Sequence, residues 1–127
     1  MFLIIYKGHY LYKIYNKTKK TIIVNKVRVA DTFYSRLVGL LNKKSLSSEE
    51  ALLITHCQSI HMFFMKFSID VIFVNKKNIV VGLVKNIKPF ALSRIFFKAS
   101  YAIEGAVGMI DKGKVEKGDV LILQQDA

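Results

Sequence analysis

Residues 59–73 read SIHMFFMKFSIDVIF and form the densest apolar run of the chain. Three polar side chains, His61, Lys66 and Asp70, interrupt this run, and each is costly to bury unless it is hydrogen-bonded or paired. Short continuous apolar runs are typical of buried strands. We therefore expect two core strands joined by a bend at Ser68, with the three polar side chains beside the core.

The same patterning extends in both directions from this stretch. A helix is expected over 31–42, where apolar residues recur at helical spacing, and Gly39 within it indicates a close backbone contact. Residues 88–100 form a long connection with an apolar cluster, and such a segment is expected to cover a barrel mouth or a site. One helical turn is expected over 106–111. The predicted strands cover residues 10–15, 21–24, 26–29, 51–54, 60–66, 69–74, 79–84, 101–104 and 120–123.

Many short strands with one main helix predict a mainly β (α+β) fold. We expect a small antiparallel β-barrel or sandwich with one principal helix packed against it. The 127 residues correspond to a single domain over 1–127. No apolar run reaches the roughly 18–20 residues that a membrane helix needs, and the single cysteine, Cys57, fits a reducing compartment. We expect a cytoplasmic protein without a membrane span.

The net charge of +11 is concentrated near the N-terminus. Residues 1–44 carry ten Lys or Arg against one acid, Asp31, within a basic N-terminal β hairpin region. One interpretation is a face for nucleic acid or another anionic partner. The alternative, which we favour, is a solvated edge of lysines that deters strand pairing, because arginine, the residue favoured for base readout, occurs there only as Arg28 and Arg36.

Five separated blocks resemble a single family. They are RLVGLL at 36–41, EALLI at 50–54, the stretch 61–73, EGAVG at 104–108 and the pair at 118–119. In this order they resemble the bacterial and archaeal family named "domain of unknown function 192" over about residues 30–123. The resemblance implies a compact, mainly β domain with one principal helix, and it implies no activity.

The chain departs from the family pattern at several positions. Ala51 stands where the family usually has glycine, and Phe64 stands where many members have tryptophan. Gly105 and Ala106 stand where a Leu-Pro pair is common, which changes the turn before Gly108.

A candidate polar site is formed by Arg36, His61, Asp70 and Glu104, which lie in the family-like blocks. One hypothesis is a pocket for a small polar or anionic ligand, with the Arg36 guanidinium binding a carboxylate or phosphate and His61 donating a hydrogen bond or carrying a proton. The alternative, which we favour, is a structural network in which Arg36 pairs with Asp70 or Glu104. Four residues are expected at structural turns or close contacts: Gly39, Gly108, Gly118 and Asp119.

Other chemistry has weaker support in the sequence. His56, Cys57 and His61 cluster, but a structural zinc site wants four ligands in paired short spacings, so we expect no metal and no cofactor. The apolar surroundings of Cys57 indicate an inert thiol. The chain has no phosphate-binding glycine loop, no G-x-S-x-G elbow and no H-E-x-x-H motif.

Three function hypotheses follow. The leading one is a non-enzymatic ligand- or protein-binding accessory module. The second is an enzyme of unassigned reaction type that uses His61 as acid or base with Arg36 or Lys66 as anion holder. The third is a nucleic-acid binder that uses the basic N-terminal third.

Overall fold

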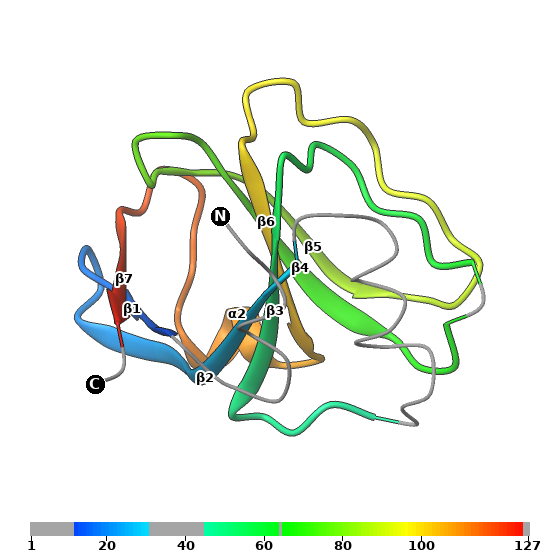
Figure 1. Ribbon diagram of the computed structural model, residues 1–127, viewed down its shortest axis with the longest axis horizontal. Helices are drawn as coiled ribbons and strands as arrows, with labels where there is room; N and C mark the ends of the chain where they lie inside the picture. The colour runs from blue at the N-terminus through cyan, green and yellow to red at the C-terminus, as the bar shows by residue number, and fades with distance from the viewer. Residues whose placement is uncertain (1–11, 31–44, 64, 126–127) are drawn as a thin grey trace.

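The computed structural model describes residues 12–30, 45–63 and 65–125 (Figure 1). Within these residues the elements are β1 (Tyr12–Asn16), β2 (Thr21–Ala30), β3 (Glu50–Thr55), β4 (Ile69–Val74), β5 (Val80–Ile87), β6 (Tyr101–Ala106), α2 (Met109–Lys112) and β7 (Leu121–Gln125).

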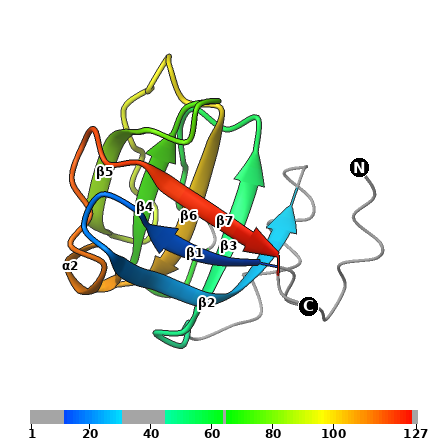
Figure 2. The same cartoon turned by 90° about the vertical axis from the view of Figure 1, so that its left-hand side faces the viewer.

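The seven strands form one curled sheet in the order β5-β4-β6-β3-β2-β1-β7 (Figure 2). Neighbouring strands are antiparallel except β2 and β3, which run parallel. The two edge strands approach each other at one corner, where Ile79 bridges Val120, but the sheet does not close into a barrel. The fold is mainly β in the α+β class, as the sequence predicts.

The central strands separate two apolar cores because alternate side chains of a strand point to opposite faces. β4 is buried along its whole length, which confirms the prediction of a buried core strand from its mainly apolar sequence. Ile72 and Val74 belong to the first core, together with residues of β1, β2, β7 and α2. Val71 and Phe73 belong to the second core, on the opposite face of the sheet.

An irregular two-stranded ribbon, residues 57–63 and 88–100, covers the second core. We call it the outer ribbon. Backbone hydrogen bonds join its two segments; for example, the Met62 N–H donates to the Ala91 carbonyl at 2.9 Å. The ribbon contributes Ile60, Met62, Phe96 and Ala99 to the second core.

The prediction of a regular strand over 60–66 is wrong. The described residues of this stretch form a single β-bridge, from His61 to Leu92, and then a turn. Phe63 is exposed and Met65 is buried, although strand alternation would put both side chains on one face.

The facing segment explains why no ladder forms there. Pro89 has no backbone N–H to donate to a partner strand. The next residue, Phe90, has φ 68°, in the left-handed region that turns the chain. Regular pairing therefore cannot extend along the ribbon.

Two further predictions concern helices. The helix expected over 31–42, with Gly39 and Arg36 inside it, lies outside the described residues. The single helical turn expected over 106–111 is present as α2, but it spans Met109–Lys112, because Ala106 still belongs to β6.

Candidate functional site

Asp70 is 1% exposed, and both of its carboxylate oxygens accept backbone hydrogen bonds. Its Oδ1 accepts from the Asn86 N–H at 2.9 Å. Its Oδ2 accepts from the N–H groups of Gly108 and Ile110, both at 3.1 Å. Asp70 thus links three segments: β4, β5 and the start of α2.

Each of these N–H groups has a local reason to need an acceptor. The register between β4 and β5 shifts after Ile69, which leaves an extra residue on β5 in a bulge; Asn86 lies there with φ 51°. Gly108 is the N-cap of α2 with φ 103°, and it has no side chain with which to cap the helix itself. Asp70 supplies the missing acceptor from a neighbouring strand.

Glu104 is fully buried on the other face of the sheet. The strand register pairs Glu104 with Leu52 on β3 and with Val71 on β4, and both neighbours belong to the second core. Asp70 pairs with Gly105 instead, one residue out of phase. The carboxylates of Asp70 and Glu104 therefore point to opposite faces of the sheet.

His61 lies on the outer ribbon, away from the strand ladder. Its ring centroid is 5.1 Å from that of Phe63, and its backbone bridges Leu92. Arg36 lies outside the described residues, so its expected pairing with Asp70 or Glu104 falls outside them too. The described structure does not bring the Asp70 and Glu104 carboxylates into a common site.

Asp119 and Gly118 lie in the turn before β7. Gly118 has φ 96°, a conformation that side chains disfavour. Asp119 is 4% exposed, and its Oδ2 accepts from Asn16 Nδ2, Lys19 Nζ and the Glu116 N–H, each at 2.9 Å. We call Asn16, Lys19 and Asp119 the hairpin lock because they join the β1–β2 hairpin to the segment before β7.

The hairpin lock changes the protonation behaviour of its charged groups. Burial desolvates the Asp119 carboxyl and by itself raises its pKa, but hydrogen bonds from Asn16, the Glu116 N–H and Lys19 outweigh this effect, so the pKa lies below its usual value. The pKa of Lys19 is raised by its hydrogen bonds to Glu116 and Asp119. The lock is therefore a buried, charge-assisted structural network.

The outward face of the outer ribbon is the most apolar exposed surface among the described residues. Of their seven large exposed hydrophobic side chains, five project from this ribbon, with exposures from 44% to 78%. They are Phe63, Phe90, Leu92, Ile95 and Phe97. Residues on the outer side of a surface segment are ordinarily polar, so a concentration of this kind is unusual for a solvent-exposed face.

The charged residues within the ribbon and next to it in sequence have one sign. Lys66, Lys88, Arg94 and Lys98 are all exposed, and residues 57–69 and 86–100 contain no Asp or Glu. The Arg94 guanidinium lies 4.6 Å from the centroid of the Phe96 ring, in a cation–π contact. The sequence reveals the apolar cluster within 88–100 but not the orientation of its side chains. Only the pairing with 57–63 shows which of these side chains face outward.

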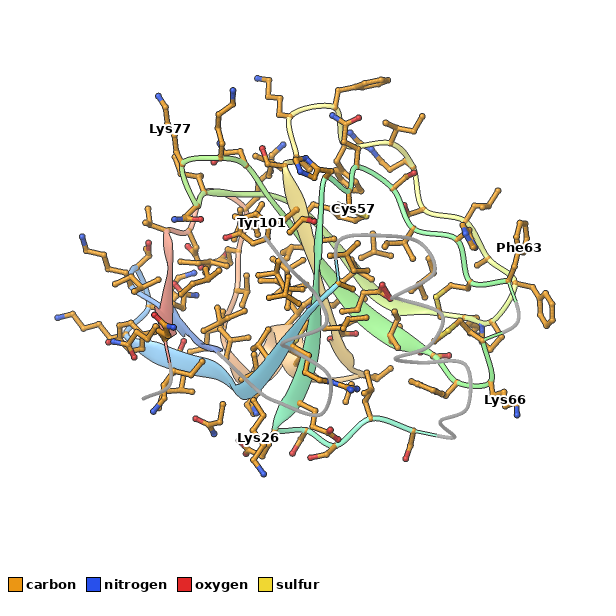
Figure 3. The ribbon with its side chains drawn as sticks, viewed as in Figure 1. Lys26, Cys57, Phe63, Lys66, Lys77 and Tyr101 are labelled. Carbon is orange, nitrogen blue, oxygen red and sulfur yellow. The ribbon has the colours of Figure 1, made fainter. Side chains whose placement is uncertain are left out.

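A second charged surface lies at the other end of the molecule. Figure 3 shows Lys77 at the opposite end from Phe63 and Lys66. Three turns meet there: the Lys17 N–H donates to the Val120 carbonyl at 2.9 Å, and the Leu121 N–H donates to the Asn78 carbonyl at 2.8 Å. We call their exposed lysines the lysine end: Lys17, Lys20, Lys76, Lys77, Lys114 and Lys117.

Across residues 12–30, 45–63 and 65–125, no group of three or more His, Cys, Asp or Glu side chains has an arrangement that could hold a metal ion. Over the same part of the chain, no helix has the length and apolar character needed to cross a membrane.

Comparison with known proteins gives consistent matches. The family model DUF192, described as "Uncharacterized ACR", matches residues 14–123. A UPF0127 protein of Thermococcus sibiricus is 38% identical over 108 residues, which cover 82% of this chain and 70% of the relative. A UPF0127 protein of Pyrococcus horikoshii is 38% identical over 109 residues, which cover 84% of this chain and 94% of the relative.

A solved structure has a similar fold. A protein of unknown function from Novosphingobium aromaticivorans matches with a TM-score of 0.73 at 16% identity, covering 88% of this chain and 83% of that one. At this identity the likeness concerns the fold alone.

Proposed function

The chain belongs to the DUF192 (UPF0127) family of uncharacterised proteins, and within that family we propose that it is a non-enzymatic binding module whose contact surface is the outward face of the outer ribbon. The observation that carries the proposal is the set of five exposed apolar side chains on that face. Exposed apolar patches rimmed by polar groups mark interaction sites in soluble domains.

The ribbon suits this role because its inner face anchors it. Phe96 stacks on Phe73 of β4 with the ring centroids 4.3 Å apart, and Ile60 and Met62 are buried beside them. The outward side chains are thus presented on a backbone that is fixed to the core, which limits the ordering cost of binding.

An enzymatic role for the predicted polar set receives less support. The three backbone N–H groups on the Asp70 carboxylate give it a structural task. The carboxylate of Glu104 belongs to the opposite face of the sheet. A catalytic pair needs its groups within hydrogen-bond reach of a common substrate, and these two carboxylates do not meet that condition. The enzyme hypothesis itself pairs His61 with Arg36, which lies outside the described residues, so it stays a prediction.

Site-specific photo-crosslinking in cells tests the proposal. The crosslinking residue p-benzoylphenylalanine replaces Phe97 in one variant and Val107, an exposed apolar residue outside the ribbon, in a matched control. We expect a defined adduct from position 97, protein or lipid by mass, that disappears when Phe90→Ser and Leu92→Ser are added. The same adducts from both positions, or none from position 97, would count against the proposal.

A second candidate function, nucleic-acid binding, is favoured by the lysine end. Its lysines come from three turns far apart in the sequence: Lys17 and Lys20 belong to the basic N-terminal third, and the other four lie later in the chain. The acids in this region, Glu116 and Asp119, are both engaged by Lys19. Duplex DNA binding that weakens steeply with salt is the expected signature.

A further inference from the structure

We propose that the partner of the outer ribbon is the interface of an anionic lipid bilayer. This inference rests on the proposed function and adds the class of partner. It combines two observations: apolar side chains project from the ribbon, and the charged residues among them are all cations.

The order of residues along the ribbon favours a membrane interface. Cations alternate with apolar side chains along the second segment, where Lys88 precedes Phe90, Arg94 precedes Ile95 and Lys98 follows Phe97. At a bilayer surface, apolar side chains enter the boundary between headgroups and acyl chains while nearby Lys and Arg contact lipid phosphates. The core of a protein–protein interface is instead depleted of charged residues.

The identity of the apolar residues separates a bilayer from single-stranded nucleic acid. Proteins bind single strands by stacking bases on aromatic rings. Leu92 and Ile95 have no ring, yet they are 68% and 49% exposed on the same face. Aliphatic side chains among cations fit an acyl boundary better than a row of bases.

The exposed backbone of the ribbon does not prevent this mode of binding. Unpaired polar groups are excluded from the hydrocarbon interior of a bilayer, but only side-chain tips need to enter the boundary. The N–H groups of Met62, Ser93 and Phe96 are already bonded across the ribbon.

Vesicle co-sedimentation of the full chain tests the inference. Vesicles of phosphatidylcholine mixed with phosphatidylglycerol are compared with vesicles of phosphatidylcholine alone. We expect the wild-type protein to pellet with the anionic vesicles and to stay in solution with the neutral ones. Leu92→Ser with Phe97→Ser should weaken the partition coefficient by about tenfold or more, and Lys88→Gln should weaken it by about fivefold at low salt.

Two controls make the result specific. Ile22→Ser with Val107→Ser removes two exposed apolar side chains elsewhere on the molecule, which are 49% and 52% exposed, and we expect it to leave vesicle binding unchanged. Circular dichroism verifies that each variant is folded. Failure of the folded wild-type protein to sediment with anionic vesicles would overturn the inference. Equal loss of vesicle binding in the two double variants would also overturn it.

Failure of the lipid inference can be distinguished from failure of the binding module. If position 97 gives a protein adduct and the protein does not bind vesicles, the proposal of a binding module stands and the proposal of a lipid partner is overturned. Binding of single-stranded poly(U) RNA that is lost in the Leu92→Ser, Phe97→Ser variant, without vesicle binding, would assign the face to nucleic acid and overturn the lipid proposal.

Discussion

The Asp70 carboxylate accepts hydrogen bonds from backbone N–H groups of two other segments of the chain. Gly108 takes a left-handed conformation at the start of α2, which suits glycine but leaves no side chain to cap the helix. At the bulge on β5, the Asn86 N–H donates to Asp70 Oδ1. A carboxylate has two oxygens with about four acceptor positions, so Asp70 satisfies both segments at once.

Replacing Asp70 by alanine should therefore lower the free energy of unfolding by about 3 kcal/mol or more, because three N–H groups lose their charged acceptor in a buried place. Urea denaturation monitored by circular dichroism measures the change. Asp111→Asn is the control: its exposed ion pair with Lys85 should be worth less than about 1 kcal/mol. A loss as small as the control's would show that the N–H groups find other acceptors.

Residue types were easier to predict from the sequence than residue partners. A carboxylate at position 70 within an apolar run predicts a compensated buried group, and Asp70 is indeed buried and bonded. Its partners Asn86, Gly108 and Ile110 lie 16, 38 and 40 residues away. The register that sends Asp70 and Glu104 to opposite faces depends on strand pairing, which periodicity alone does not reveal.

At the scale of elements, the hairpin lock fastens two segments that are remote in the sequence. Asn16 donates to Asp119 across 103 residues, and its amide also reaches the Gly113 carbonyl at 3.2 Å. These bonds tie the β1–β2 hairpin to the turn that leads into β7. The hairpin lock thus joins separate elements, and through Asp119 it also stabilises the local turn before β7.

The lock should give the protein a measurable acid sensitivity. The folded-state pKa of Asp119 lies below its ordinary value of 3.8, so its contribution to stability is complete above about pH 5 and is lost as the pH falls through the folded-state pKa. Asp119→Asn should lower stability near neutral pH and show a smaller further loss between about pH 5 and about pH 2.

Urea unfolding across this pH range makes the comparison. Glu49→Gln changes an exposed carboxylate outside the lock and should keep the wild-type pH dependence. If Asp119→Asn also keeps it, the acid sensitivity belongs to other carboxylates.

The outer ribbon shows where pattern reading fails for an element. Its apolar content predicts a strand over 60–66, and three residues of that stretch, Ile60, Met62 and Met65, are buried. The backbone nevertheless turns, because the facing segment contains Pro89 and a left-handed Phe90. Burial was predictable from composition, whereas regular pairing required knowledge of the partner segment.

At the scale of the whole molecule, two surfaces of different chemistry, the outer ribbon and the lysine end, lie at opposite ends. The outer ribbon is apolar with cations around it, and the lysine end is polar and cationic (Figure 3). The sequence shows an excess of lysine in its first third, but the charges of the lysine end gather only when three turns meet. Strand order, which composition does not encode, decides this grouping.

If the lysine end binds duplex DNA, Lys76→Gln with Lys77→Gln should reduce the slope of log affinity against log salt by about two. Fluorescence anisotropy at several salt concentrations gives this slope. Lys66→Gln with Lys88→Gln, at the opposite end, is the matched control and should leave the slope unchanged. Equal slopes for both variants would remove the lysine end as a nucleic-acid surface.

The pairing of β1 with β7 has a consequence for how the chain is made. Tyr12 lies opposite Gln125 in this ladder. During synthesis β1 leaves the ribosome before β7, so the outer edge of β1 stays uncovered until β7 has also emerged. Until then β1 presents unpaired N–H and C=O groups to the surroundings. Long-range pairing of this kind slows folding, and the uncovered edge of β1 favours aggregation of the nascent protein until β7 pairs with it.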